Sequence, residues 1–282
     1  MTATPQDAFL SLNGFRLHYL DWGGEGQPTV LMVHGLTRQA HAFDGLAARL
    51  AGRYRCLAID VRGRGESEWT PPETYHYRQY TDDVAAFADA LGLERFHYVG
   101  TSMGGHIGMH LAARQPERFL SLVLNDIAPE TAQGGSTRIQ QFVSGTPARL
   151  PSFEACVERE TERFPWTAHL PRAELEAAVR HQVRRHEDGS WAMKYDPQII
   201  RGRLTDPEAR RQAGELMWQG FRALRVPILL VLGAITDLVD PAVVRAMQEA
   251  QPTMRVATVP GVGHAPSLNE PEAVAALAVH FG

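Results

Sequence analysis

The chain is poor in cysteine, with two such residues, Cys56 and Cys156, in 282. Two cysteines cannot build the cross-linked framework of a small secreted scaffold, and their scarcity favours a reducing compartment. Cys56 lies in the apolar segment Cys56-Leu57-Ala58-Ile59. We therefore expect its thiol to be buried rather than reactive.

Long apolar runs are absent as well. The longest are strand-length, which excludes a membrane-spanning helix. Residues 1–7 lack the basic and then apolar pattern of a secretory signal peptide. The sequence therefore predicts a cytoplasmic protein without a membrane partner.

The sequence also lacks an excess of positive charge. With 28 Lys and Arg against 32 Asp and Glu, the net charge is −4, which leaves no basic footprint for nucleic acid. Neither an internal repeat nor a low-complexity segment is found. The composition, 44% hydrophobic, suffices for one large domain with an insertion. The expected partner is a small-molecule substrate, and the oligomeric state is not predicted.

The pentapeptide Gly100-Thr101-Ser102-Met103-Gly104 is the most informative segment present. It fits G-x-S-x-G, in which a serine occupies a strained turn between a strand and a helix. Phe96-His97-Tyr98-Val99 reads as the buried strand before the turn, and residues 105–113 read as the helix after it. The glycines permit the close approach of strand and helix backbones, so Ser102 is the candidate nucleophile.

A nucleophilic serine needs a base and an acid that orients the base. The apolar run 227–232 predicts a central strand, and the turn after it carries Asp237. Residues 254–259 predict the next strand, which leads into a glycine-rich loop with His264. Ser102, Asp237 and His264 thus each follow the carboxyl end of a predicted strand, where open parallel sheets bind ligands.

Two other aspartates compete with Asp237 for the role of the acid. Asp240 precedes Pro241, which is typical of the start of a helix. Asp126 follows the predicted strand 120–125 directly and stays an alternative, because triads are defined by geometry rather than by sequence position. We expect Asp237 to be the acid.

With these segments in place, nearly the whole chain resembles the α/β-hydrolase superfamily. The order Ser, acid, His is that of the superfamily. Val33-His34-Gly35-Leu36 looks like its H-G-x oxyanion segment, and residues 60–67 look like its D-x-R-G-x-G-x-S loop. The resemblance implies an oxyanion hole formed by the backbone N–H groups of Leu36 and Met103.

The predicted fold class is α/β, with a mostly parallel, doubly wound sheet and an inserted helical cap. Residues 1–128 and 216–282 alternate strands and helices, which predicts the α/β-hydrolase core. Early strands are expected at 15–22 and 29–34, and a helix at 80–91. Residues 129–215 differ in composition, and prolines divide them into short helices. The resemblance implies that this segment is a cap over the active site.

Three aromatic residues of the predicted cap, Phe142, Trp166 and Trp191, are candidates for substrate contact, because pockets have mostly apolar linings. His106 and His110 have the four-residue spacing of metal ligands, but the glutamate of H-E-x-x-H and a third ligand are missing. We expect neither a metal nor an organic cofactor. His34 is expected to be structural.

The predicted activity is hydrolysis of a small, fairly apolar carboxylic ester or lactone through an acyl-enzyme. A serine in the elbow argues against the dehalogenase and epoxide hydrolase branches, which use aspartate there. Ser102-Met103-Gly104-Gly105 also resembles carbon–carbon bond hydrolases of ring-cleavage products, which is the alternative. Thr101 and Arg62 depart from the asparagine and proline usual in those enzymes. A non-catalytic ligand receptor on the same fold is a further, weaker alternative.

Overall fold

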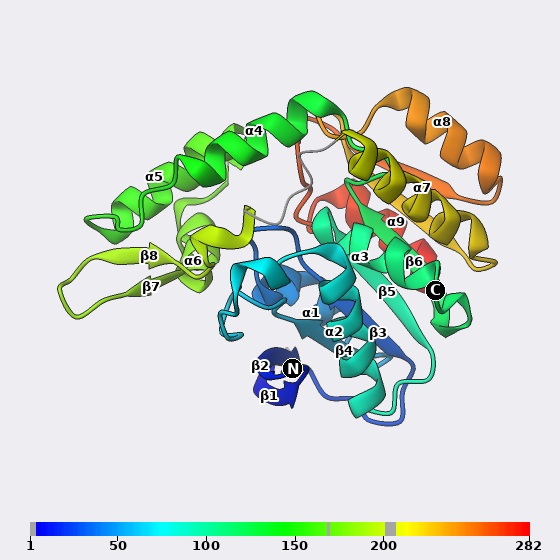
Figure 1. The fold of residues 1–282 in the computed structure, drawn as a ribbon, viewed down its shortest axis with the longest axis horizontal. Coiled ribbons are helices and arrows are strands. Elements are labelled where there is room, and N and C mark those ends of the chain that lie inside the picture. Colours follow the sequence, from blue (N-terminus) through cyan, green and yellow to red (C-terminus); the bar gives the residue numbers. More distant parts are fainter. Residues whose placement is uncertain (1–3, 168–169, 201–206) are drawn as a thin grey trace.

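The computed structural model describes residues 4–167, 170–200 and 207–282, and a central sheet organises them (Figure 1). Within these ranges the sheet has eight strands, in the order β1-β2-β4-β3-β5-β6-β9-β10. The strands are β1 (Gln6–Leu12), β2 (Phe15–Asp21), β3 (Thr29–Val33), β4 (Arg55–Ile59), β5 (Phe96–Thr101), β6 (Phe119–Asn125), β9 (Ile228–Gly233) and β10 (Arg255–Val259). β1 and β2 pair antiparallel, as do β2 and β4, and the remaining pairs are parallel. The expected α/β fold with a mostly parallel sheet is confirmed.

Helices flank this sheet and extend beyond it. The α-helices are α1 (Asp44–Leu50), α2 (Tyr77–Ala90), α3 (Met103–Ala112), α4 (Gln133–Ser144), α5 (Phe153–Arg163), α6 (Arg172–Gln182), α7 (Pro207–Ala223), α8 (Pro241–Ala250) and α9 (Pro271–Phe281). Short 3-10 helices are η1 (Ala40–Phe43), η2 (Pro72–Thr74), η3 (Pro116–Arg118), η4 (Pro165–Thr167) and η5 (Pro197–Ile200). Among the described helices, none is long and apolar enough to cross a membrane.

The alternation of side chains along the strands divides the core into two layers. In β3, Leu31 and Val33 belong to one hydrophobic cluster, and Val30 and Met32 belong to the other. This follows from the two-residue period of a strand. Residues of α2, α3 and α7 join the first cluster, while residues of α1 and α9 join the second. Each face of the sheet is thus covered by helices, as buried parallel strands require.

The sequence reading missed β1, which pairs with β2 through a two-residue turn. Asn13 and Gly14 form the turn with φ values of 49° and 78°. Two positive φ values in succession characterise the tight hairpin turn that Asn-Gly favours. The Asn-Gly dipeptide was therefore a usable signal for this hairpin.

Residues 129–215 lie between β6 and β9, and their middle part has a small core of its own. α5, α6 and the hairpin of β7 (Val183–Arg185) and β8 (Trp191–Met193) contribute to a separate hydrophobic cluster. In Figure 1 these elements project to the left, and α4 leads from the core toward them. The sequence reading expected short helices here and missed the hairpin, although Asp188-Gly189 marks its turn.

α7 connects this insertion to the core. The helix packs against α3, and an added Cβ at Gly220 would lie 1.8 Å from the carbonyl oxygen of Met109. The expected division between residues 215 and 216 therefore falls inside one continuous helix. We use "cap" below for α4 to η5, residues 133–200 as far as they are described.

Candidate active site

Ser102 occupies a strained turn between β5 and α3. Its φ is 51° and its ψ is −114°, a conformation that L-residues adopt rarely and that is concentrated at functional sites. The flanking glycines are needed for close packing. A Cβ added to Gly100 would lie 2.5 Å from the backbone nitrogen of Gly105. A Cβ added to Gly104 would lie 1.9 Å from the carbonyl oxygen of Val33. The sequence therefore fixes Ser102 at the tip of the turn, as predicted.

His264 lies on the loop between β10 and α9 and faces Ser102. Its Nε2 atom is 2.8 Å from Ser102 Oγ, and both residues are 8% exposed. Its Nδ1 atom is 2.7 Å from Asp126 Oδ2. With the proton on Nδ1, the ring donates to Asp126 and Nε2 accepts the hydrogen bond of the Ser102 hydroxyl. Such an imidazole is set to take up the serine proton.

Asp126, not Asp237, is the carboxylate at His264, so the expectation for Asp237 is wrong in this respect. Asp126 directly follows β6, has φ 53° and is fully buried. Its carboxylate also accepts hydrogen bonds from Gly233 N at 2.8 Å and from Thr236 Oγ1 at 2.6 Å. The turn that carries Asp237 thus holds the rival acid in place.

Asp237 itself points toward the cap. Arg138 of α4 donates two hydrogen bonds to its carboxylate, of 2.6 and 2.7 Å. The side chain of Arg138 is 38% exposed and that of Asp237 is 42% exposed. The hydrogen bonds from Arg138 hold the pKa of Asp237 below its usual range. The other rival, Asp240, accepts a hydrogen bond from Ala242 N and caps α8, as predicted. Proximity to a strand end alone could not separate Asp126 from Asp237, because each follows one of two adjacent strands.

The predicted oxyanion segment approaches the serine closely. An added Cβ at Gly35 would lie 3.5 Å from Ser102 Cβ, so the next peptide, that of Leu36, lies beside the candidate nucleophile. Met103 begins α3, where the first backbone N–H groups have no partner within the helix. Both N–H groups that the sequence indicated as oxyanion donors therefore lie on segments adjacent to Ser102.

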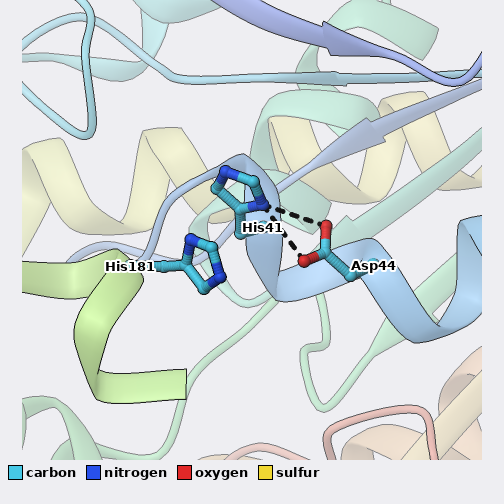
Figure 2. A group of neighbouring side chains, drawn as sticks. All are labelled: His41, Asp44 and His181. Atoms are coloured by element: carbon cyan, nitrogen blue, oxygen red, sulfur yellow. Dashed lines mark hydrogen bonds and ion pairs between the residues drawn. The ribbon is translucent and has the colours of Figure 1, made fainter. Parts of the chain in front are cut away.

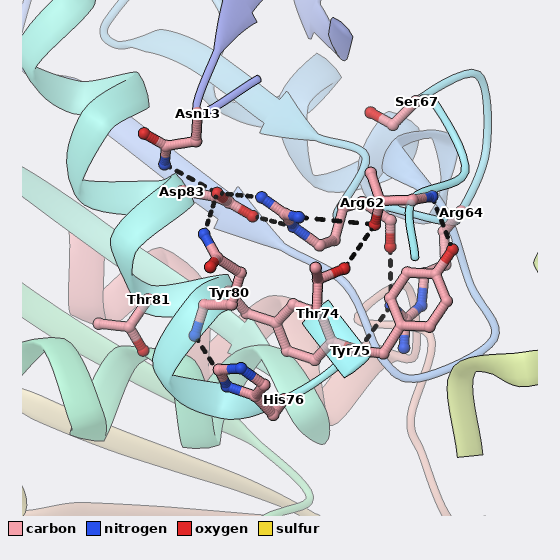
Figure 3. A network of polar contacts seen from close by, with 12 residues as sticks. Asn13, Arg62, Arg64, Ser67, Thr74, Tyr75, His76, Tyr80, Thr81 and Asp83 are labelled. Atoms are coloured by element: carbon pink, nitrogen blue, oxygen red, sulfur yellow. Dashed lines mark hydrogen bonds and ion pairs between the residues drawn. The ribbon is translucent and has the colours of Figure 1, made fainter. Parts of the chain in front are cut away.

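Arg64 ties these two segments together, a role that the sequence reading missed. Its Nε donates to Leu36 O at 3.0 Å, and its Nη2 lies 3.6 Å from Met103 Sδ. Nη1 donates to Tyr80 Oη at 2.9 Å, a contact in the network of Figure 3. Arg64 is fully buried, and its hydrogen bonds in the described part of the chain go to neutral groups. Its contacts thus join the two segments that would form the predicted oxyanion hole.

The loop 60–67 owes its shape to buried polar contacts around Asp60 and Arg62. Asp60 accepts hydrogen bonds from Ala40 N at 2.6 Å and Glu66 N at 2.8 Å. Arg62 donates to both carboxylate oxygens of Asp83, at 2.5 and 2.7 Å, in the network of Figure 3. These contacts hold the loop that presents Arg64.

His34 is structural, as expected from its position beside Gly35. Its Nδ1 donates to Gly35 O at 2.6 Å, and its Nε2 accepts from Val61 N at 3.0 Å. Burial lowers the pKa of His34 to about 4. The imidazole is therefore neutral at physiological pH, and it joins the oxyanion segment to the loop 60–67.

The three candidate substrate-contact residues occupy different surroundings. Trp166 packs on the His264 loop, since an added Cβ at Gly263 would lie 2.5 Å from its ring. The Phe142 ring faces the guanidinium groups of two cap arginines. Trp191 packs within the cap cluster, 5.2 Å from the Phe153 ring. Trp166 is thus the aromatic residue in contact with the candidate active site, whereas Trp191 has a packing role in the cap.

Among the histidines, His106 is engaged by protein groups on both nitrogens, at Tyr77 Oη and Ala128 O. A different group, His41, Asp44 and His181, brings its donor atoms within 4.8 Å of one another (Figure 2). The His41 and His181 rings stack, with centroids 3.9 Å apart and planes at 28°. Because imidazole lone pairs lie in the ring plane, stacked rings do not aim at one ion. We interpret the group as a packing contact between the segment η1–α1 of the core and α6 of the cap.

Comparisons with known proteins extend the resemblance over the chain. Residues 28–271 match the family described as the alpha/beta hydrolase fold. The chain is 35% identical to a 3-hydroxybutyrate-oligomer hydrolase of Cupriavidus necator, over 98% of the chain and 97% of that protein. It is 29% identical to an N-formylmaleamate deformylase of Pseudomonas putida, over 90% and 88%.

The fold agrees with a solved structure as well. An alpha/beta hydrolase of Novosphingobium aromaticivorans superposes with a TM-score of 0.88 at 31% identity, covering 100% of this chain and 99% of that one. The family match covers well over half of the chain, and the fold observed here is the one that the match describes. The chain therefore belongs to the alpha/beta hydrolase fold family and is a hydrolase.

Proposed function

We propose that the protein hydrolyses a small carboxylic ester through an acyl-enzyme on Ser102. The observation that carries the proposal is the continuous path from Ser102 Oγ to His264 Nε2, at 2.8 Å, and from His264 Nδ1 to Asp126 Oδ2, at 2.7 Å. This is the arrangement in which an imidazole accepts the serine proton while a buried carboxylate fixes its tautomer.

The reaction follows from the roles of these groups. Ser102 Oγ attacks the acyl carbon as its proton passes to His264 Nε2, and the imidazolium formed is stabilised by Asp126. The developing oxyanion accepts hydrogen bonds from the backbone N–H groups of Leu36 and Met103. Loss of one such donor raises the barrier by about 2.7–4 kcal/mol in related sites. His264 returns its proton to the leaving alcohol and then activates the water that releases the acid.

The similarity to a 3-hydroxybutyrate-oligomer hydrolase favours esters of short hydroxy acids as the first substrates to test. Such an oligomer is joined by ester bonds, which the proposed acyl-enzyme chemistry cleaves. Ring-cleavage dienones, the substrates of the alternative activity, and simple lactones belong in the same screen.

The test joins labelling to turnover. We expect a fluorophosphonate to label the wild type at Ser102, and Ser102→Ala to abolish both labelling and ester hydrolysis without unfolding. Ser190→Ala, in the β7–β8 turn and hydrogen-bonded to Asp188, is the matched control and should keep full activity. Labelling at another residue, or near-normal turnover by Ser102→Ala, would overturn the assignment.

A further inference from the structure

Arg163, the last residue of α5, reaches from the cap to the predicted oxyanion segment. Its Nη1 donates to Thr37 Oγ1 at 2.6 Å. Thr37 is buried and follows Leu36, whose N–H is a proposed oxyanion donor. The guanidinium therefore contacts the residue that directly follows a proposed oxyanion donor.

Aromatic rings hold the guanidinium in this position. Its carbon lies 4.4 Å from the Phe142 ring centroid and 4.7 Å from that of Phe164. The Phe164 ring meets that of Trp166 at 5.4 Å, and Trp166 packs on Gly263 beside His264. Arg163 therefore belongs to a series of side-chain contacts that extends from the oxyanion segment to the His264 loop. Rings against a guanidinium fix its plane and leave its N–H edge to bind other groups.

The acidic residue that acts on the charge of Arg163, Glu160 of the same helix, is paired with another arginine. Neighbouring Arg138 pairs with Asp237, and Arg38 lies 2.6 Å from Glu160. Arg163 forms no such ion pair within the described part of the chain. Burial and the nearby charge of Arg38 lower its pKa to about 10, although Glu160 opposes this shift, so the group is still charged at neutral pH. A partly buried cation is stabilised by a hydrogen-bonded anion, and in residues 4–167, 170–200 and 207–282 no carboxylate forms an ion pair with Arg163.

We propose that Arg163 binds a carboxylate of the substrate, so that the substrate is a short ester bearing a free carboxylate a few bonds from the scissile carbonyl. The guanidinium edge can donate two parallel hydrogen bonds to one carboxylate. This inference rests on the proposed function of Ser102, and it adds a charged end to an otherwise small and apolar acyl group. It also assigns Arg163 as a residue that determines specificity.

The test compares two esters that differ only at this end. Monomethyl glutarate carries a carboxylate where methyl pentanoate carries a methyl group, and methanol release reports hydrolysis of either. Arg163→Met removes the charge at similar length. We expect its kcat/KM for monomethyl glutarate to fall about 10- to 100-fold, as for loss of a hydrogen bond to a charged group. Its kcat/KM for methyl pentanoate should stay within about threefold of the wild type, and Arg163→Lys should recover part of the loss.

Arg159→Met is the matched control on the same helix. Arg159 also lies over the Phe142 ring, at 4.6 Å, but it donates to Thr146 Oγ1 within the cap. The variant therefore removes a similar side chain without touching the oxyanion segment. We expect its preference between the two esters to match that of the wild type.

Glutarate itself provides a readout that needs no turnover. It should slow fluorophosphonate labelling of Ser102 in the wild type and in Arg159→Met, but not in Arg163→Met. Equal loss on both esters in Arg163→Met, or equal protection by glutarate in all three proteins, would overturn the carboxylate site. Absence of any labelling at Ser102 would instead refute the proposed function, so the two failures are distinguishable.

Discussion

Replacing Asp126 by Asn is the sharpest test of the site, because it changes one atom of a fully buried group. The carboxylate accepts hydrogen bonds from Gly233 N and Thr236 Oγ1 and faces His264 Nδ1 at 2.7 Å. Asn keeps the size and shape, and its amide oxygen can still accept from Gly233. Its NH₂ group then faces the ring and favours the tautomer protonated on Nε2. That tautomer directs a proton at Ser102 and cannot act as the base.

The magnitude follows from the lost base. The same change in a serine protease triad lowers kcat by about 10⁴, equivalent to about 5.4 kcal/mol in the barrier. Asp237→Asn removes only a half-exposed ion pair with Arg138, and exposed pairs contribute about 0–1 kcal/mol. Because Asp237 has no hydrogen bond to His264 or Ser102, we expect the kcat of Asp237→Asn to stay within about fivefold of the wild type, or roughly 1 kcal/mol in the barrier.

The assay is steady-state hydrolysis of a chromogenic ester by both variants, with the rate of Ser102 phosphonylation as a second measure. Urea unfolding of each protein separates a lost base from a lost fold. A near-normal Asp126→Asn, or an Asp237→Asn that loses thousands-fold while still folded, would refute the reasoning. In that case the acid would belong to the loop after β9.

Two further predictions concern the cap and the response to acid. Trp166→Ala should change the ratio of kcat/KM between short and long acyl esters, by an amount equivalent to about 1–3 kcal/mol, because the ring packs on Gly263. Trp191→Ala should lower the stability of the protein and leave this ratio unchanged. The same ratio in both variants would contradict this difference. Lowering the pH from 6.5 to 4 should cost up to about 3 kcal/mol of the free energy of unfolding through His34, because the unfolded ring takes up a proton near 6.5 and the buried ring only at about 4. Urea unfolding at several pH values in this range gives the free energy of unfolding as a function of pH. We expect this free energy to fall less steeply with decreasing pH in His34→Gln than in the wild type. An equally steep fall in both proteins would show that His34 is not responsible.

The elements around the candidate nucleophile and base could be predicted because each depends on local pattern. β5, the elbow and α3 follow from an apolar run, two glycines and the helix behind them. α2 begins at Tyr77 rather than Tyr80, because His76 Nδ1 accepts a hydrogen bond from Gln79 N and caps the helix. Such a cap depends on a rotamer and leaves little trace in the hydrophobic pattern.

The acid and the role of Arg64 could not be predicted in this way. Asp126 and Asp237 follow adjacent strands, and their side-chain directions depend on contacts over about a hundred residues, above all that of Arg138 with Asp237. Arg64 reads as an ordinary charged loop residue until the fold brings Leu36 and Met103 to it. The cytoplasmic location stays a prediction.

The turn after β9 has a consequence for exchanging caps between related enzymes. Three successive residues of this turn contact three different parts of the protein. Thr236 donates a hydrogen bond to Asp126 of the candidate active site. Asp237 pairs with Arg138 of α4, and the carbonyl oxygen of Leu238 accepts a hydrogen bond from Ala132 N just before α4. A cap transplanted at its own sequence boundaries would meet a foreign turn on which the acid also depends. A chimera should therefore carry residues 236–238 together with the inserted segment, as one grafting unit discontinuous in sequence.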